Sequence, residues 1–366
     1  MAKAKYIMIG GFLGAGKTTA VLALARRLRD AGQRPGLITN DQSFGLADTA
    51  LLASDGFAVE EIGGGCFCCR FNSLVEASEN LSRENRPDAF IAEPVGSCTD
   101  LRAAVSYPLR RIYGEDFEVA PLSVLVDPVR AERMLGLESG RAFAPKVHYV
   151  YGKQLEEADA IVINKADLLD AARLDRLRRA LAERFPAARL FTVSLRRGDG
   201  LDEWFEYLLT GQSGLQPSPE VDYEIYAEGE ALLGWLNCTI RVTGPGEFDG
   251  HPFLQSLALG IRNSVKMGEI AHLKMTLAPD EGNDLAVLNL VRNDGMVEFS
   301  HRLQAPLQSG ELIVNLRAED DPEQMWTRLR ASLEASAAEA GVTARIEQHE
   351  FFRPAKPNPT HRMAFA

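Results

Sequence analysis

Gly11-Phe-Leu-Gly-Ala-Gly16-Lys17-Thr18 follows a short apolar run, Tyr6–Ile9, and precedes an amphipathic helical pattern. The stretch fits G-x-x-x-x-G-K-[ST] at every fixed position, and the strand–loop–helix context is the one in which this motif binds phosphate. Its glycines allow backbone N–H groups to point at phosphate oxygens, and the helix N-terminus adds a partial positive charge. We therefore predict a P-loop nucleotide-binding fold.

Each position of this loop has an expected role. Lys17 is expected to neutralise the β- and γ-phosphates, and the Thr18 hydroxyl to ligate Mg²⁺. Since hydrolysis of a phosphoanhydride depends mainly on positioning and charge neutralisation, Lys17 is also a predicted catalytic residue. The predicted phosphate contacts are Gly11, Gly14, Ala15, Gly16, Lys17, Thr18 and Thr19.

Short apolar runs alternate with helical patterns over residues 1–210, which predicts an α/β domain with a mostly parallel sheet. Residues 211–221 are rich in glycine, serine and proline and read as a linker. Residues 222–352 show a different order of predicted strands and helices, typical of a smaller α+β domain with a ferredoxin-like arrangement. The remaining residues, 353–366, hold three prolines and are expected to be an irregular tail.

The composition of the chain limits the classes of function and partner that the protein could have. The 366 residues carry a net charge of −11, which argues against a general nucleic-acid partner or an anionic membrane surface. No apolar run reaches the ~18 residues needed to span a bilayer, and the N-terminus lacks a signal-peptide pattern. We expect a cytoplasmic protein, a reducing setting in which clustered cysteines indicate metal or redox chemistry.

A second motif predicts which base is bound. Asn164-Lys165-Ala-Asp167 comes directly after the apolar run Ile161–Ile163 and resembles the N-K-x-D motif that selects guanine. A carboxylate at Asp167 can accept from both N1–H and the exocyclic amine of guanine, whereas adenine would leave it unpaired. Asn164 and Lys165 are expected to support the base, with Ser194 as a further residue of the base-binding loop.

Acidic residues after two further strands are candidates for the hydrolytic chemistry. In Glu93-Pro-Val-Gly96, the carboxylate is expected to hold Mg²⁺ and the Gly96 N–H to contact the γ-phosphate; the alternative is a solvated strand-end glutamate. Asp41 opens the expected switch segment, residues 40–45. Asp41 and Glu93 are therefore predicted catalytic residues, either orienting water or holding Mg²⁺. No arginine finger is assignable, so slow intrinsic turnover is expected.

Three of the five cysteines fall within four residues, in Gly63-Gly-Gly-Cys66-Phe-Cys68-Cys69. Thiolates favour Zn²⁺ and other thiophilic ions such as Co²⁺, and three ligands leave a fourth position open for exchange. The cluster lies between the expected switch and Glu93, in a region that changes shape with the γ-phosphate. A structural zinc, a redox thiol site and buried cysteines are the alternatives, and Cys98 is a possible extra ligand.

Together these motifs resemble the CobW-like family of P-loop GTPases, over roughly residues 1–210. The resemblance rests on residues 11–18, 65–69, 93–96 and 164–167. It implies a metallochaperone in which Mg²⁺ and GTP build a metal site at Cys66, Cys68 and Cys69, and hydrolysis to GDP releases the metal. The switch is two residues longer than the family's Asn-Glu-Phe-Gly, and the histidine-rich loop of many members is absent.

The leading functional hypothesis is thus a GTPase that delivers a transition metal to a client metalloprotein or cofactor-assembly protein. One alternative is a GTP-gated activator of a metal- or corrinoid-dependent enzyme with a permanently bound structural zinc. A small-molecule kinase is a third hypothesis, which the guanine motif and the cysteines oppose. The sequence leaves the client, the physiological metal and homodimerisation open.

Overall fold

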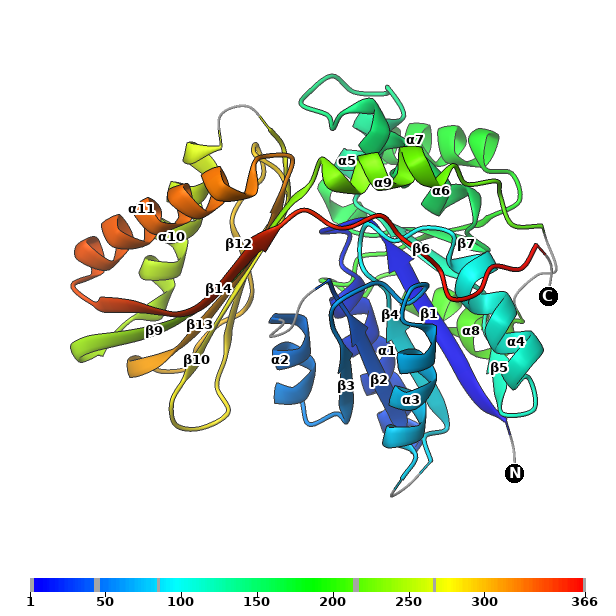
Figure 1. Ribbon diagram of the computed structural model, residues 1–366, viewed down its shortest axis with the longest axis horizontal. Coiled ribbons are helices and arrows are strands. Elements are labelled where there is room, and N and C mark those ends of the chain that lie inside the picture. Colours follow the sequence, from blue (N-terminus) through cyan, green and yellow to red (C-terminus); the bar gives the residue numbers. More distant parts are fainter. Residues whose placement is uncertain (1–2, 43–46, 84–85, 213–216, 266–267, 365–366) are drawn as a thin grey trace. The chain divides into compact units, whose positions relative to one another are not determined.

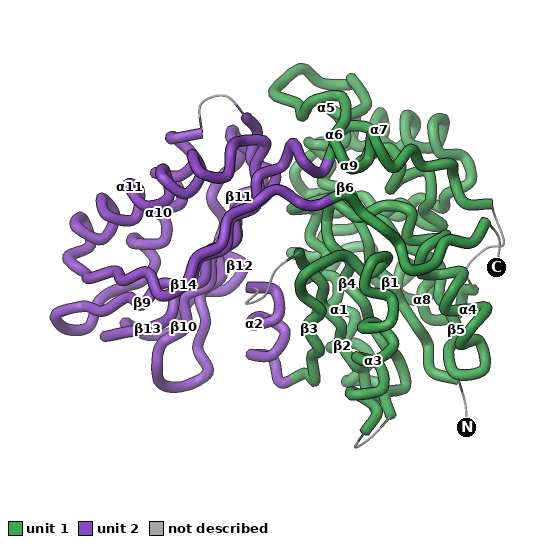
Figure 2. Tube along the Cα trace, viewed as in Figure 1, with its two compact units in different colours: residues 1–44, 57–229, 356–366 green, residues 45–56, 230–355 purple. Residues whose placement is uncertain are grey.

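The computed structural model describes residues 3–42, 47–83, 86–212, 217–265 and 268–364. Two compact units make up the chain, and both are discontinuous in sequence (Figure 2). Unit 1 comprises residues 1–44, 57–229 and 356–366, and unit 2 comprises residues 45–56 and 230–355. Each unit has its own sheet.

A parallel sheet forms the centre of unit 1, in the strand order β3-β2-β4-β1-β6-β7-β8, with β5 also paired to β1 (Figure 1). The strands are short and apolar because both faces of the sheet are covered, and Ile7, Ile161 and Ile163 are fully buried. The strands are β1 (Ala4–Gly11), β2 (Pro35–Asn40), β3 (Val59–Ile62), β4 (Ala89–Glu93), β5 (Phe117–Val119), β6 (Ser123–Val126), β7 (Ala160–Ile163) and β8 (Arg189–Thr192).

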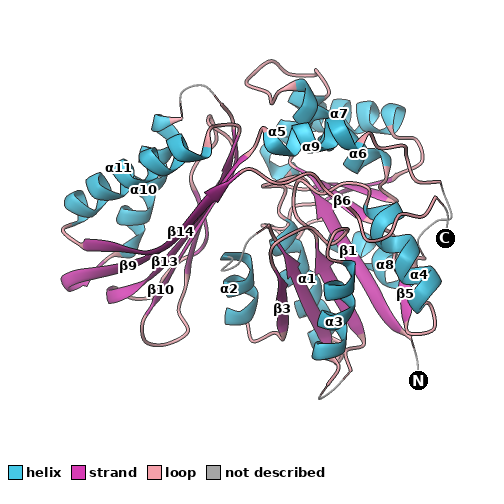
Figure 3. Cartoon of the chain, in the orientation of Figure 1, coloured by secondary structure: helices cyan, strands magenta, loops and turns pink. Residues whose placement is uncertain are grey.

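Helices connect these strands and lie around the sheet (Figure 3). The first helix is amphipathic as predicted, since Val21, Leu24 and Leu28 are buried on one face, and it ends before Gly32, which has φ +76°. The helices are α1 (Lys17–Asp30), α3 (Phe71–Leu81), α4 (Tyr107–Tyr113), α5 (Pro128–Met134), α6 (Pro145–Glu156), α7 (Ala171–Arg184), α8 (Leu201–Thr210) and α9 (Tyr223–Ala231), with a π-helical segment Arg102–Ser106 before α4 and a 3-10 turn Ala166–Leu168.

The topology of the sheet determines where the predicted functional residues lie. β1 lies in the middle of the sheet, between β4 and β6, and the predicted P-loop follows it. In parallel sheets the carboxyl ends of the strands meet at one edge, where ligands bind. That edge carries residues that end five other strands or follow them within two positions, namely Asn40, Glu93, Asp127, Asn164 and Ser194.

Unit 2 is an antiparallel sheet in the order β12-β11-β10-β13-β9-β14, with helices α10 and α11 on its apolar face. Without the β11–β12 hairpin, the connectivity is the split βαβ arrangement, which confirms the predicted α+β class. The elements are β9 (Gly234–Phe248), α10 (Gly250–Ser264), β10 (Ile270–Pro279), β11 (Ala286–Leu290), β12 (Glu298–His301), β13 (Leu307–Ala318), α11 (Pro322–Ala340) and β14 (Thr343–Phe352).

Two features of unit 2 follow from local sequence, and one does not. Asp321 caps α11 by accepting from the N–H groups of the first turn, and Gly341 ends the helix at φ +66°. By contrast, α2 (Ala47–Ser54) joins unit 2 from far away in the chain, where the Ala47 N–H donates to Asn315 Oδ1 at 3.0 Å. Within the described ranges, every helix is too short or too polar to cross a membrane.

Candidate nucleotide and metal site

The P-loop adopts a conformation that its glycines permit. Gly11, Gly14 and Gly16 have φ values of +132°, +76° and +100°, which side chains with a Cβ rarely adopt. A Cβ at Gly11 would lie 2.4 Å from the Leu125 carbonyl oxygen, and one at Gly16 would lie 2.4 Å from Asn164 Nδ2. The close backbone turn therefore depends on glycine, and it leads into the N-terminus of α1.

Three predicted side chains converge at the start of α1. The Thr18 hydroxyl donates to Glu93 Oε1 at 3.2 Å, and Lys17 Nζ lies 3.9 Å from the same oxygen. All three side chains are buried. A hydroxyl and a carboxylate at this separation are hard oxygen ligands that suit Mg²⁺, while the lysine supplies a positive charge for phosphate.

Other residues predicted near the phosphates are also placed. Thr19 is exposed in the first turn of α1. Gly96 approaches the P-loop closely, because a Cβ there would lie 3.0 Å from the Leu13 nitrogen. Asp41 follows β2, and its N–H donates to the Ile62 carbonyl at 3.2 Å. The rest of the predicted switch segment, residues 43–45, lies outside the described residues.

The predicted base-binding residues form one hydrogen-bonded group with the P-loop. Asn164 donates from Nδ2 to the Ala15 carbonyl at 2.9 Å and accepts from the Leu195 N–H at 3.2 Å. Ser194 donates its hydroxyl to Asp167 Oδ1 at 2.6 Å. Partial burial alone would raise the pKa of Asp167, but the Ser194 hydrogen bond and the nearby arginines outweigh it and lower the pKa. Asp167 is thus an oriented, ionised acceptor.

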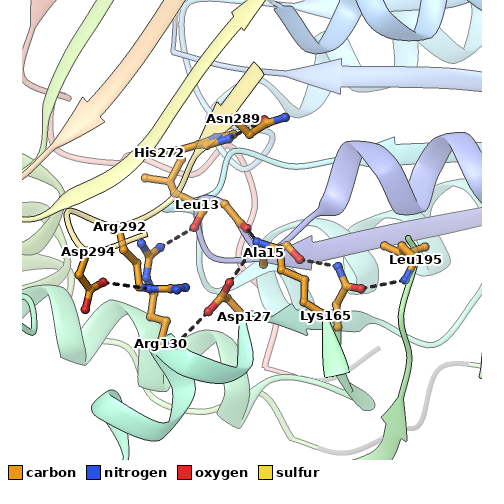
Figure 4. A network of polar contacts seen from close by, with 12 residues as sticks. Leu13, Ala15, Asp127, Arg130, Lys165, Leu195, His272, Asn289, Arg292 and Asp294 are labelled. Atoms are coloured by element: carbon orange, nitrogen blue, oxygen red, sulfur yellow. Dashed lines mark hydrogen bonds and ion pairs between the residues drawn. The ribbon is translucent and has the colours of Figure 1, made fainter. Parts of the chain in front are cut away.

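Two residues that the sequence analysis missed hold the P-loop, and one of them also contacts the base-binding loop (Figure 4). Asp127, directly after β6, accepts from Lys165 Nζ at 3.0 Å, and the same ammonium group donates to the Gly14 carbonyl at 2.8 Å. Arg130 donates to the Leu13 carbonyl at 2.6 Å and stacks over Phe12. Asp127 could have been predicted from the sequence, because it is a carboxylate that directly follows an apolar run. The sequence around Arg130 contains no pattern that indicates its role.

The three clustered cysteines come together in a tight turn. Their Sγ atoms lie 2.8 Å (Cys66–Cys68), 3.3 Å (Cys66–Cys69) and 3.8 Å (Cys68–Cys69) apart. The turn closes where the N–H groups of Cys69 and Arg70 both donate to the Cys66 carbonyl. In a tetrahedral zinc thiolate with Zn–S bonds of ~2.3 Å, sulfurs lie roughly 3.8 Å apart. A small outward movement would therefore let all three bind one ion.

The pKa values of two of the clustered thiols, Cys68 and Cys69, are raised. Hydrogen bonding to the Cys66 thiol is the largest cause that raises the pKa of Cys69, to about 11. The pKa of Cys68 is also raised, through contacts with Cys66, with Cys69 and with Cys98, which lies beside it in the core. Metal binding must therefore displace protons from this cluster.

A single side chain joins the end of β2 to the cysteine loop. Asn40 is buried, and its Nδ2 donates to the Ile62 carbonyl at 2.8 Å and to the Gly65 carbonyl at 2.7 Å. Its neighbour Thr39 pairs in register with Glu93 of β4. The backbone just before Cys66 is thus attached to the strand that lies beside the Glu93 carboxylate.

A P-loop after the central parallel strand, with a base-binding loop after β7, defines a P-loop NTPase domain. Residues 5–192 match the family described as CobW/HypB/UreG, nucleotide-binding domain. The chain therefore belongs to this family of P-loop GTPases, as its resemblance at the motif level implied.

Individual relatives match parts of the chain. The zinc chaperone YeiR of Escherichia coli (strain K12) is 31% identical over 166 residues, 44% of this chain and 46% of YeiR. The zinc chaperone CobW of Sinorhizobium sp is 29% identical over 196 residues, 48% of this chain and 55% of that protein. The chain spans about half the length of the curated relatives it matches. Among solved structures, Zn(II)-bound YjiA GTPase from E. coli is 16% identical, covering 90% of this chain and 99% of YjiA, with a TM-score of 0.39.

Proposed function

We propose that this protein binds and hydrolyses GTP, holds Zn²⁺ or a similar ion such as Co²⁺ at Cys66, Cys68 and Cys69, and delivers the metal to a client metalloprotein or cofactor-assembly protein. The observation that carries the proposal is the Asn40 bridge, because it joins the phosphate side of the sheet to the loop that holds three converging thiols. The names of the zinc-chaperone relatives support the choice of metal cargo.

In this proposal, the P-loop backbone, Gly96 and Lys17 bind the phosphates. Thr18 and Glu93 would hold Mg²⁺, which supplies positive charge to the transferring phosphoryl group when bound. Asp41 is the remaining acidic candidate for orienting the attacking water. Turnover is slow without a partner, because none of the residues proposed to contact the phosphates is an arginine.

Base selection follows from the ionised state of Asp167. Ser194 orients the Asp167 carboxylate and Lys165 holds the loop against Gly14, so that the carboxylate can accept from the two donors of guanine. Asn164 fixes the distance between this loop and the P-loop through the Ala15 carbonyl. GTP and GDP therefore share the same base contacts, and only the γ-phosphate distinguishes the two states.

Metal handling depends on linkage between the two sites. If GTP binding shifts Glu93 together with the neighbouring end of β2, the hydrogen bond from Asn40 to the Gly65 carbonyl transmits that shift to the cysteine loop. Any factor by which GTP tightens metal binding must equal the factor by which metal tightens GTP binding. Loss of the γ-phosphate then loosens the metal for transfer.

The metal ligands are tested by replacing Cys66, Cys68 and Cys69 singly with serine. We expect each variant to bind Zn²⁺ at least roughly 100-fold more weakly, more than the ~10- to 100-fold cost of losing an outer-shell partner. Competition with a chromogenic chelator measures this affinity. A Cys238→Ala variant, changed in the core of unit 2, serves as the control. GTP binding should persist in all four, and unchanged Zn²⁺ affinity in the serine variants would refute the metal site.

A further inference from the structure

The C-terminal segment, residues 356–364, belongs to unit 1 (Figure 2), and its hydrogen bonds place it against the cysteine loop. The Asn358 N–H donates to Cys69 Sγ at 3.2 Å. Thr360 donates its N–H to the Cys68 carbonyl at 2.8 Å and its hydroxyl to the Cys69 carbonyl at 3.1 Å. Three consecutive contacts therefore join this segment, which we name the tail clamp, to two of the three clustered cysteines.

The prolines of the tail clamp restrict its backbone to conformations that favour this contact. Pro357 and Pro359 fix their own φ angles and lack N–H groups, and each proline restricts the residue before it to extended conformations. Asn358 is the one residue of this triplet that can donate a backbone hydrogen bond, and the donor faces Cys69 Sγ. An extended segment that is already restricted loses little conformational entropy when it binds.

A buried carboxylate anchors the far end of the tail clamp. Arg362 Nε donates to Asp100 Oδ2 at 2.8 Å, and Asp100 is fully buried with φ +65°. Tyr223 donates its hydroxyl to the same carboxylate oxygen at 2.6 Å. Nearby, the His361 ring meets Phe71 edge to face at 4.9 Å, directly after the cysteine loop. The tail clamp is thus anchored C-terminal to its contacts with the cysteine loop.

The position of the tail clamp matches the exposure of the thiols. Cys66 and Cys68 are buried at 2% and 1% exposure, whereas Cys69 is the partly exposed member of the cluster. Asn358 contacts the sulfur of this more exposed cysteine. Any ion or reagent that reaches the cluster from the side of Cys69 therefore meets the tail clamp.

We propose that residues 356–364 close the metal site, with Asn358 as a positioning residue for the Cys69 sulfur, so that Zn²⁺ enters or leaves after the tail clamp opens. This inference rests on the proposed function for its metal cargo. The contact itself is a property of the metal-free protein. Opening would free the Cys69 sulfur and the Cys68 and Cys69 carbonyls together, since the same segment holds all three.

Alkylation of metal-free, reduced full-length protein tests the closure without any metal. The variants are Arg362→Ala, which removes the anchor, and Asn358→Pro, which removes the single donor; Arg179→Ala, at an exposed pair on α7, is the matched control. Mass spectrometry after N-ethylmaleimide treatment follows each cysteine. We expect Cys69 to react roughly fivefold faster or more in both variants, the change produced by losing one net hydrogen bond from a closed state.

Cys238 in the core of unit 2 reports on global unfolding in the same samples, so its rate should stay constant. A second assay follows transfer of Zn²⁺ from loaded protein to a chelator, which should also accelerate in both variants. Equal rates in wild type and both variants, in either assay, would overturn the tail clamp. Failure of wild-type protein to bind Zn²⁺ would instead refute the proposed function, and the alkylation rates would still decide the closure.

Discussion

At the scale of single residues, the base-binding loop is the most constrained part of the nucleotide site. Lys165 takes a left-handed φ of +54° so that its ammonium group reaches both Asp127 and the Gly14 carbonyl. Ser194 orients Asp167 through a 2.6 Å hydrogen bond. The carboxylate is therefore fixed before any base arrives, which lowers the entropy cost of recognising guanine.

Replacing Asp167 with asparagine should weaken GTP binding by roughly 100-fold or more, since hydrogen bonds to a charged acceptor contribute about 1.5–3 kcal/mol each. Guanine offers two donors, and the amide has one acceptor for them. Competition against a fluorescent GTP analogue measures the loss. Asp170→Asn, at the N-cap of α7, is the matched control and should bind GTP normally. Unchanged GTP affinity in Asp167→Asn would show that another residue reads the base.

At the scale of elements, the end of β2 is the proposed connection between the nucleotide site and the metal site. Asn40 terminates the strand and hydrogen-bonds the glycine turn that leads to Cys66, while the strand itself pairs with β4 up to Glu93. A strand held on one edge by the phosphate site and at its end by the metal loop can transmit a small shift. This is a two-site coupling that a side-chain deletion can test.

The variant Asn40→Ala should retain Zn²⁺ binding, because it leaves all three thiols in place, and should lose most of the difference in Zn²⁺ affinity between the GTP and GDP states. Chelator competition in each nucleotide state measures both quantities. Asn263→Ala, at an exposed position on α10 in unit 2, is a matched control that should keep the difference. A difference of wild-type size in Asn40→Ala would place the coupling elsewhere.

The predictability of these elements depends on where their contacts come from. Buried parallel strands are continuous apolar runs, so β1, β4, β6 and β7 were visible in the sequence, and the caps of α11 were visible as Asp321 and Gly341. The P-loop and the cysteine turn are local motifs, and they too could be predicted. The placement of α2 in unit 2 could not, because it depends on contacts such as that of Ala47 with Asn315.

The same limit applies to the site. The Asn40 bridge involves main-chain carbonyls, which carry no sequence signature. The tail clamp joins Asn358 to Cys69 across 289 positions, and an irregular proline-containing tail gives no sign of its target. Long-range contacts made by backbone groups are therefore the part of the site that sequence patterns leave out.

At the scale of the whole molecule, the stability of unit 1 includes a buried acid. Glu157 is fully buried, where its carboxylate accepts from the Thr99 hydroxyl at 3.1 Å and the Arg102 N–H at 2.9 Å. Burial raises the pKa of Glu157 from 4.5 to about 8, and the nearby Asp100 charge adds to this, against the hydrogen bonds and the Arg102 charge. The folded protein therefore keeps this proton when the unfolded chain releases it.

The raised pKa of Glu157 determines how the stability of the fold depends on pH. The contribution of Glu157 to stability is fully present below pH 4.5 and is lost as the pH rises to about 8. We expect Glu157→Gln to have a flatter dependence of unfolding free energy on pH over this window, measured by urea unfolding of both proteins. As the pH rises through this window, the unfolding free energy of the variant should increase relative to that of wild type. The total increase is about 1.4 kcal/mol for each unit by which folding raises the pKa of Glu157. Parallel pH profiles would show that Glu157 is ionised in the folded state.

The central claim is that nucleotide state controls metal affinity in one molecule. The most direct measurement titrates metal-free wild-type protein with Zn²⁺ against a competing chelator, first with Mg²⁺ and a non-hydrolysable GTP analogue and then with Mg²⁺ and GDP. The account predicts Zn²⁺ affinity at least roughly tenfold higher in the GTP-like state, a coupling of about 1.4 kcal/mol. Equal affinity in the two states would contradict it and would favour a GTP-gated activator that keeps its zinc throughout the cycle.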